Sequence, residues 1–336
     1  MAGEVETALI ERYFRHLGSV RTDVVLGIGD DAALLRAPPG NELAMTTDSL
    51  VEGVHFHPGA APRSLGHRAL AVNLSDLAAM GARPCWALLS LSLPAIDEAW
   101  LGEFSTGFGL LARSFNVALV GGNLSRGPLN ITVQLCGTVP SGTALRRSGA
   151  RPGHELWVSG TLGDAAAGLQ LGSEAVSAAA GTADVTNAAS TASATEREWL
   201  RGRFEFPTPR LALGQALRGI ASSCMDLSDG LLADAARLAE ASGCGAIIQV
   251  EQLPVSAALR AHEPASSWQR ALQGGEDYEL CFTAPTEQAA RLQELATELA
   301  LPLTPCGTLQ AAAGLELRSG SSVIQFSQSS FEHFIS

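Results

Sequence analysis

Short acidic motifs recur along this chain, and they carry the residues whose types could do chemistry. Most of their acidic residues stand beside Gly, Ser or Thr, and several motifs follow an apolar run. The motifs are Gly29-Asp30-Asp31, Thr46-Thr47-Asp48, Asn73-Leu74-Ser75-Asp76, Asp226-Leu227-Ser228-Asp229-Gly230 and Gly274-Gly275-Glu276-Asp277. Carboxylates and hydroxyls at strand ends and helix starts suit a hard cation, and Mg²⁺ commonly bridges protein carboxylates to phosphate. The motifs therefore predict a protein that holds several Mg²⁺ ions against a polyphosphate.

Taken alone, some of these motifs also have a purely structural interpretation. Ser228 or Asp229 could cap a helix, although a capped helix start is also an anion site. The segment Gly274-Gly275-Glu276-Asp277 could be a hairpin turn. Asp30 and Asp31 are different, because adjacent carboxylates repel each other unless a cation holds them. That repulsion favours a metal-binding role for the pair.

Two weaker signals remain open between structure and function. Gly160 and Gly163 could form a tight strand-to-helix turn, or they could let backbone amides approach a phosphate. His55 and His57 lie two residues apart, but no acidic or Cys partner stands at metal spacing, so a zinc site is not expected. We interpret His55 as a polar substrate contact or an exposed residue.

The absence of lysine limits the chemistry more than any motif does. All 22 basic residues other than His are Arg. A Walker A loop and a protein kinase both need a Lys on the nucleotide phosphates, and Schiff-base chemistry needs a Lys amine. Any nucleotide chemistry must therefore use metal ions, Arg and backbone amides.

Composition excludes other classes. The net charge of −12 disfavours nucleic acid as a partner. The amino-terminal residues have mixed charges and no apolar signal region, and no apolar run reaches membrane-spanning length. We expect a cytoplasmic protein with no membrane partner. Its cysteines are expected to be reduced and buried, at positions 85, 136, 224, 244, 281 and 306.

Hydrophobic periodicity predicts alternating helices and strands, and hence an α/β or α+β fold. The expected helices span residues 4–17, 64–80, 97–115, 231–241 and 286–299. The expected strands span residues 43–47, 86–93, 117–120, 130–139, 155–158, 246–250, 278–283 and 303–307. In this prediction Asp48 stands at the end of its strand, and Gly121-Gly122-Asn123 directly follows another.

Length and composition suggest two domains. Residues 141–153 are rich in Gly, Ser and Arg and mark a junction, so we assign residues 1–141 and 142–336 to the two domains. Residues 173–195 are dominated by Ala, Ser and Thr and are expected to form a variable loop or a weak helix.

The motifs together resemble the thiamine-monophosphate kinase family in order and spacing. The resemblance runs from about residue 4 to residue 334, apart from the Ala/Ser/Thr segment. Its most specific part is the run Ala71-Val72-Asn73-Leu74-Ser75-Asp76-Leu77-Ala78-Ala79-Met80-Gly81, with the paired motifs near residues 226–230 and 274–280.

The resemblance implies ATP-dependent phosphorylation of thiamine monophosphate to thiamine diphosphate, with several Mg²⁺ ions. It also implies a two-domain fold like that of aminoimidazole ribonucleotide synthetase. In such a fold the amino-terminal domain, which binds metal and ATP, pairs in a homodimer through a barrel-like sheet. The carboxy-terminal domain completes the active-site cleft.

The resemblance also implies roles for individual residues. The metal-binding positions are Asp31, Thr46, Thr47, Asp48, Asp76, Asp226 and Asp229, with Asp30 as a neighbour that shares the work. The ATP-binding positions are Gly122, Asn123, Arg147 and Ser228. The substrate-binding positions are His55 and Glu276.

Two departures from the family pattern are visible. The family usually has Asp as a metal ligand where this chain has Asn123, which offers a carbonyl oxygen but no charge. One Mg²⁺ is therefore expected to bind more weakly, or through a water. The family usually covers the substrate ring with a carboxy-terminal Trp; here Phe326 is our candidate and Phe331 the alternate.

The implied acceptor is a phosphate monoester, whose second pKa is about 6. It is largely dianionic at neutral pH, so no residue is needed as a general base. The obstacle is repulsion between two anions, which metal ions can neutralise while they align in-line attack on the γ-phosphorus. We expect direct transfer without a phosphoenzyme.

Three alternative functions differ in the residues that they require. Selenophosphate synthetase chemistry uses an amino-terminal Cys or selenocysteine with a nearby Lys, and this chain has neither. A pseudoenzyme that binds nucleotide or thiamine phosphate without turnover is kept open by Asn123. A purely structural metal-binding protein is disfavoured, because no D-x-D-x-D-G loop is present.

Overall fold

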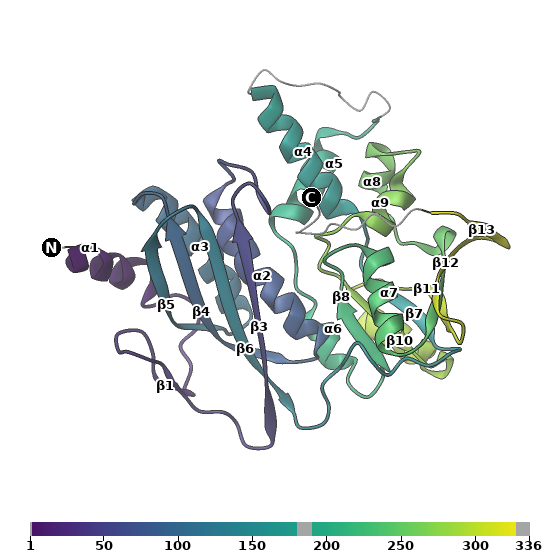
Figure 1. Cartoon of the computed structure of the whole chain (residues 1–336), viewed down its shortest axis with the longest axis horizontal. Helices are drawn as coiled ribbons and strands as arrows, with labels where there is room; N and C mark the ends of the chain where they lie inside the picture. The colour runs from purple at the N-terminus through teal and green to yellow at the C-terminus, as the bar shows by residue number, and fades with distance from the viewer. Residues whose placement is uncertain (1, 180–189, 327–336) are drawn as a thin grey trace. The chain divides into compact units, whose positions relative to one another are not determined.

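The computed structural model describes residues 2–179 and 190–326, and its chain divides into two compact units. The first contains Met1–Leu77 and Ala82–Ala144, and the second contains Ala78–Gly81 and Leu145–Ser336. Each unit has its own sheet and its own helices (Figure 1). The predicted mixed two-domain fold is confirmed, while the functional division at residues 141 and 142 stays a prediction.

The first unit is built on a four-stranded sheet in the order β3-β6-β4-β5. Strand β6 pairs antiparallel with both β3 and β4, and β4 pairs parallel with β5. A two-stranded ribbon of β1 and β2 accompanies this sheet. The strands are β1 (Val24–Leu26), β2 (Leu34–Leu35), β3 (Asn41–Val51), β4 (Arg83–Leu93), β5 (Ala118–Arg126) and β6 (Asn130–Pro140).

Helices α2 (Pro62–Ala79) and α3 (Glu98–Ser114) cover one face of this sheet (Figure 1). They pack closely, because a Cβ on Gly66 of α2 or on Gly107 of α3 would lie 2.1 Å or 1.9 Å from a carbonyl oxygen of the other helix. Asp97 caps α3 by accepting two backbone N–H bonds. On the opposite face, Leu43 and Met45 are exposed, and they line a cavity together with residues of the amino-terminal helical segment.

The second unit is built on a seven-stranded sheet in the order β13-β12-β9-β11-β7-β10-β8. All neighbouring strands pair antiparallel except β12 with β9, which pair parallel. The strands are β7 (Glu155–Ser159), β8 (Ser223–Asp226), β9 (Gly245–Gln249), β10 (Leu280–Ala284), β11 (Leu303–Gln310), β12 (Gly314–Ser319) and β13 (Ser322–Ile324).

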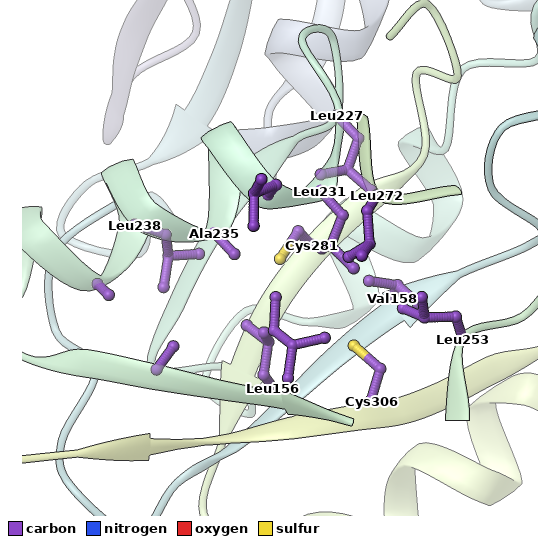
Figure 2. Close-up of a cluster of buried hydrophobic side chains, with 14 of the residues drawn as sticks. Leu156, Val158, Leu227, Leu231, Ala235, Leu238, Leu253, Leu272, Cys281 and Cys306 are labelled. Carbon is purple, nitrogen blue, oxygen red and sulfur yellow. The ribbon is translucent and has the colours of Figure 1, made fainter. Parts of the chain in front are cut away.

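Helix α7 packs on this sheet and buries the main core of the second unit. Leu231, Ala235 and Leu238 lie on its inner face at helical spacing, and each is at most 1% exposed. They meet sheet residues such as Leu156 and Cys281 (Figure 2). The helices of this unit are α4 (Asp164–Ala179), α5 (Ala194–Glu205), α6 (Leu211–Ala216), α7 (Leu231–Ala241), α8 (Ala257–His262), α9 (Ser267–Gln273) and α10 (Ala289–Glu298).

Most predicted long elements are confirmed. Helices α2, α3 and α7 match their predicted spans closely, and the predicted amino-terminal helix is α1 (Ala2–Leu9) followed by a π-helical turn. The helix predicted from residue 286 begins as a 3₁₀ turn before α10. Of the segment 173–195, residues up to Ala179 belong to α4, and 180–189 lie outside the described residues.

Two strand boundaries were predicted wrongly. Asp48 lies inside β3, which continues to Val51, because the pairing of β3 with β6 extends over the whole length of both strands. Gly121-Gly122-Asn123 lies inside β5 for the same reason, since β5 pairs with β4 as far as Arg126. Cross-strand pairing decides where a strand stops, and local sequence does not report it.

In the described part of the chain, no helix is long and apolar enough to cross a membrane. The cytoplasmic location stays a prediction.

Candidate functional site

In the second unit, the fold brings two of the acidic motifs side by side. The backbone N–H of Glu276 donates to the carbonyl of Ser228 at 2.9 Å, and the N–H of Tyr278 donates to the carbonyl of Leu227 at 2.9 Å. Strand β10 then continues the pairing, with Leu280 opposite Asp226. The two segments, far apart in sequence, therefore lie side by side, and residues 274–277 do not form the hairpin turn that the sequence left open.

Glycines allow this close approach. A Cβ at Gly275 would lie 2.4 Å from the carbonyl oxygen of Ser228, and a Cβ at Gly230 would lie 2.8 Å from backbone of Gln273. Gly230 also has φ of 100°, which disfavours other residues. Glycine is therefore required on both sides of the contact.

The backbone of the Glu276 segment is strained. Glu276 has φ of 71° and Tyr278 has φ of 50°, and neither is glycine. Such residues cost on the order of 1–3 kcal/mol each and persist where the surrounding structure holds them. The phenol of Tyr278 donates to the Glu276 carboxylate at 3.2 Å. This strain marks Glu276 as a candidate functional residue independently of the family resemblance.

The helix cap predicted at Ser228 or Asp229 is wrong. Gly230 is the N-cap of α7 and makes no side-chain cap bond. Instead Asp234, one turn into the helix and fully buried, accepts the backbone N–H of Ser228 at 3.1 Å and that of Asp229 at 3.0 Å. The side chains of Ser228 and Asp229 are thereby not needed to hold the helix start.

The glycine turn before α4 does not serve as a phosphate cradle. The N–H groups of Gly163 and Ala165 donate to the carboxyl group of Asp277 at 2.6 Å and 3.3 Å. Asp277 is 3% exposed, and this burial raises its pKa to about 8. The structural reading of this turn is therefore correct, because a protein carboxyl already occupies the anion position.

A buried ion cluster anchors the same strand one step further along. Glu279, which is fully buried, accepts bonds from Arg203 at 2.8 Å, from the Nε of Arg210 at 2.7 Å, and from the hydroxyl of Ser159 at 2.6 Å. A buried carboxylate requires such partners. The cluster ties α5 and the segment leading to α6 to the strained loop.

In the first unit, two other motifs meet. The hydroxyl of Thr46 on β3 donates to the carboxylate of Asp76 on α2 at 2.5 Å. Asp76 is half-buried, whereas Leu74 and Leu77 beside it are buried in the core. Thr47 points the other way, and its hydroxyl donates to the carbonyl of Val133 at 3.1 Å.

A cavity of about 930 Å³ lies in the first unit, and it unites two further motifs. Its lining includes Asp30, Asp31, Gly122 and Asn123 together with many apolar side chains of the sheet. Arg15 also lines it and donates to the carbonyl of Ile28 at 2.8 Å, immediately before the acidic pair. Four carboxylates share this lining with Arg15, so an anionic group of a ligand would need a cation beside it.

His55 has a defined orientation. Its Nδ1 accepts the backbone N–H of Val51 at 3.1 Å, and its carbonyl accepts a bond from the buried Arg68 at 3.2 Å. An N–H bond to Nδ1 leaves the proton of a neutral imidazole on Nε2. His55 can thus present an N–H donor, which fits the predicted polar contact.

The remaining predicted residues are only partly placed. Arg147 is exposed, and its carbonyl accepts a bond from Ser242 at 3.3 Å. The ring of Phe326 lies 6.0 Å from that of Trp268, at an angle of 54°. Phe331 lies outside the described residues.

The donor chemistry fits Mg²⁺. Within residues 2–179 and 190–326, no three His, Cys, Asp or Glu side chains lie close enough together to hold a metal by themselves. The predicted ligands are instead carboxylate, hydroxyl and amide oxygens, as in the Thr46–Asp76 pair. Mg²⁺ commonly binds to one or two carboxylates, several waters and substrate phosphates, so this set suits it, whereas zinc prefers N and S ligands.

Sequence reasoning missed the residues that support the site. Asp234, Asp277, Glu279 and Arg15 each bind backbone or side chains of a predicted motif. A weak signal existed for two of them, because Asp277 and Glu279 belong to the run Glu276-Asp277-Tyr278-Glu279. Nothing in the sequence distinguishes Asp234 from a surface acid of an amphipathic helix.

Family models match most of the chain. The model described as "AIR synthase related protein, N-terminal domain" matches residues 29–139, and that described as "AIR synthase related protein, C-terminal domain" matches residues 151–320. These two matches confirm the predicted aminoimidazole ribonucleotide synthetase-like fold.

Individual relatives are similar over nearly their full length. The thiamine-monophosphate kinase of Salmonella typhimurium is 44% identical over 98% of both chains, and that of Escherichia coli K12 is 47% identical over 91% of this chain and 90% of the relative. The crystal structure of thiamine-monophosphate kinase from Stenotrophomonas maltophilia covers 94% of both chains at 43% identity and a TM-score of 0.80. The structure of AaThiL complexed with AMPPCP and TMP covers 99% of this chain and 96% of that one, at 30% identity and a TM-score of 0.74.

The Asp277 contact generates a stability prediction. Asp277→Ala leaves two buried N–H groups without an acceptor, which should lower the free energy of unfolding by about 1–3 kcal/mol for each amide. Asp277→Asn keeps an acceptor oxygen and should cost less. Urea unfolding followed by circular dichroism measures both.

The raised pKa also predicts the pH dependence. Folded Asp277 titrates at about 8, above the unfolded value of about 3.9, so the folded state holds the extra proton between these values. The free energy of unfolding of the wild type, relative to Asp277→Asn, should therefore fall as pH rises from 5 to 8.5. A difference that is constant or grows with pH contradicts the assignment.

Proposed function

Because this chain belongs to the thiamine-monophosphate kinase family, we propose that it transfers the γ-phosphoryl group of ATP to thiamine monophosphate and forms thiamine diphosphate and ADP. The observation that supports the proposal most is that relatives named for that activity are similar in sequence to this chain over nearly their full length. The similar fold of AaThiL, solved with AMPPCP and TMP, supports the same pair of substrates.

We assign the metal-binding role to both units. In the first unit the ligands are Asp30, Asp31, Thr46, Thr47, Asp48, Asp76 and Asn123. In the second unit they are Asp226 and Asp229. Bound Mg²⁺ would neutralise the two phosphate groups and align them for in-line transfer. The protein's contribution is orientation, since Thr46 holds one oxygen of Asp76 and the Asp234 contacts hold the backbone beside Asp229.

Substrate and nucleotide contacts follow from the same residues. We assign Gly122, Asn123, Arg147 and Ser228 to ATP and His55, Glu276 and Phe326 to thiamine monophosphate. His55 would donate through Nε2, and the strained backbone of Glu276 fixes the direction of its carboxylate. No residue is assigned as a general base, because the acceptor phosphate is already largely ionised at neutral pH.

The proposal is tested by a coupled assay of the purified protein with ATP, Mg²⁺ and thiamine monophosphate, with free thiamine as the control acceptor. ADP should form only with the monophosphate. Asp76→Asn and Asp226→Asn should each lower kcat by about 100-fold or more, because each removes a carboxylate that would hold Mg²⁺, and the cation is what offsets phosphate repulsion. Asp97→Asn is a matched control, since Asn also caps helices well.

Nucleotide binding without ADP release would instead favour a binding protein that does not turn over. Wild-type turnover in either folded variant would remove that residue from the metal set.

Asn123 generates a separate prediction about metal affinity. Asn123→Asp adds a carboxylate at an exposed position of β5 that lines the cavity. The Mg²⁺ concentration for half-maximal rate should fall about threefold to tenfold. This corresponds to a binding free energy that is more favourable by about 0.7–1.4 kcal/mol. Asn41→Asp at the start of β3 makes the same change in charge as a control. If the two variants behave alike, or if Asn123→Asp raises the requirement, Asn123 is not a ligand position.

We also propose that the chain forms a homodimer through the uncovered face of the first unit's sheet. Leu43, Met45 and Leu88 on this face are 52%, 61% and 39% exposed. Exposed apolar side chains grouped on one face of a sheet are typical of a protein interface, and all three of these also line the cavity. A strand from a second copy would cover the face of this sheet that helices α2 and α3 do not cover.

This dimer is tested by light scattering. The wild type should have twice the monomer mass of 34.8 kDa. Leu88→Glu should shift it to the monomer, because burying a carboxylate without a partner is costly. Leu110→Glu is the matched control, since Leu110 is similarly exposed but lies on helix α3. A monomeric wild type at micromolar concentration would contradict the proposal.

A further inference from the structure

Arg237 on α7 makes a contact that the proposed phosphoryl transfer does not use. Its Nη1 donates to the Oδ2 of Asp229 and also, at 2.7 Å, to the Oδ1 of Asp234. One guanidinium nitrogen therefore bridges a proposed metal ligand and the buried carboxylate that holds the ligand's backbone.

Arg237 carries a positive charge beside two carboxylates. Asp229 and Asp234 each bond to it. Asp234 is fully buried and also accepts two backbone N–H groups from this loop. Two carboxylates that share one site repel each other, and the guanidinium of Arg237 offsets that repulsion.

The two bonds of Arg237 differ in strength. The side chains of Arg237 and Asp229 are 43% and 30% exposed, whereas that of Asp234 is 0% exposed. Pairs near solvent contribute little, because water screens them, while a buried carboxylate that loses its partner is strongly disfavoured. Arg237 can therefore leave Asp229 and keep its bond to Asp234.

We propose that Arg237 is a resident counter-cation of Asp229, and that a divalent cation binding at Asp229 displaces it. The proposal rests on the proposed role of Asp229 as a metal ligand. Arg237 is then a positioning residue that acts through Asp229. It holds the Asp229 carboxylate in place before a metal binds, and it lowers the affinity of that carboxylate for the metal. Asp234 keeps Arg237 beside the site in both states.

The test measures Mn²⁺ binding, with and without AMPPCP, by calorimetry and by the electron paramagnetic resonance signal of free Mn²⁺. Mn²⁺ prefers the same oxygen ligands as Mg²⁺, and neither readout needs turnover. Arg237→Gln should bind Mn²⁺ about twofold to fivefold more tightly, the range that partly exposed ion pairs allow.

Arg291→Gln is the matched control. Arg291 lies on α10, pairs with Glu294 and Glu298, and its loss changes the net charge equally. Binding by Arg237→Gln that is no tighter than binding by Arg291→Gln would overturn the proposal. Should the Gln variant not fold, as judged by circular dichroism, Arg237→Ala replaces it.

Asp229→Asn separates this proposal from the proposed function. If Asp229→Asn does not weaken Mn²⁺ binding, Asp229 is not a metal ligand. In that case both the proposed role of Asp229 and the proposed displacement of Arg237 are wrong. If it weakens binding, the double variant decides. Arg237→Gln should add nothing in the Asp229→Asn background, and a gain as large as in the wild-type background would show a general charge effect and overturn the displacement.

Discussion

The second unit depends on the backbone pairing between residues 226–230 and residues 274–280. These hydrogen bonds place Ser228 beside Glu276 and leave no room for a Cβ at Gly230 or Gly275. The strain at Glu276 is tolerated only because Asp277 and Glu279 on either side of Tyr278 are tied into the protein. The paired segments 226–230 and 274–280 are therefore held in place by the core behind them.

Hydrogen bonds and ion pairs within the fold explain how a chain without lysine accommodates many carboxylates. Some of them are structural: Asp277 fills a helix start, Glu279 binds two arginines, and Asp234 binds amides. Others lie nearer to solvent: Asp76 accepts a bond from the Thr46 hydroxyl, and Asp229 accepts one from the Arg237 guanidinium. Carboxylates of this second kind are the ones that a cation could reach.

Much of the fold could be predicted from the sequence, because amphipathic helices such as α3 and α7 show their buried stripe directly. The short strands β12 and β13 and the helices α5, α6, α8 and α9 were missed, since their periodicity is weak and tertiary packing decides them. Asp48 and Asn123 were placed after strands that in fact contain them, because partner strands set those ends.

The sequence by itself determined which atoms were available: clustered oxygen ligands, no lysine, and motif spacing that resembles one family. Only the tertiary structure decided which carboxylates are already used. Asp234, Asp277 and Glu279 look no different in sequence from Asp31 or Asp229, which lie nearer to solvent, because a carboxylate's role depends on its burial and hydrogen-bond partners. Those partners come from segments up to 120 residues away, as with Ser159 and Glu279, and chain order alone does not show which of them will meet.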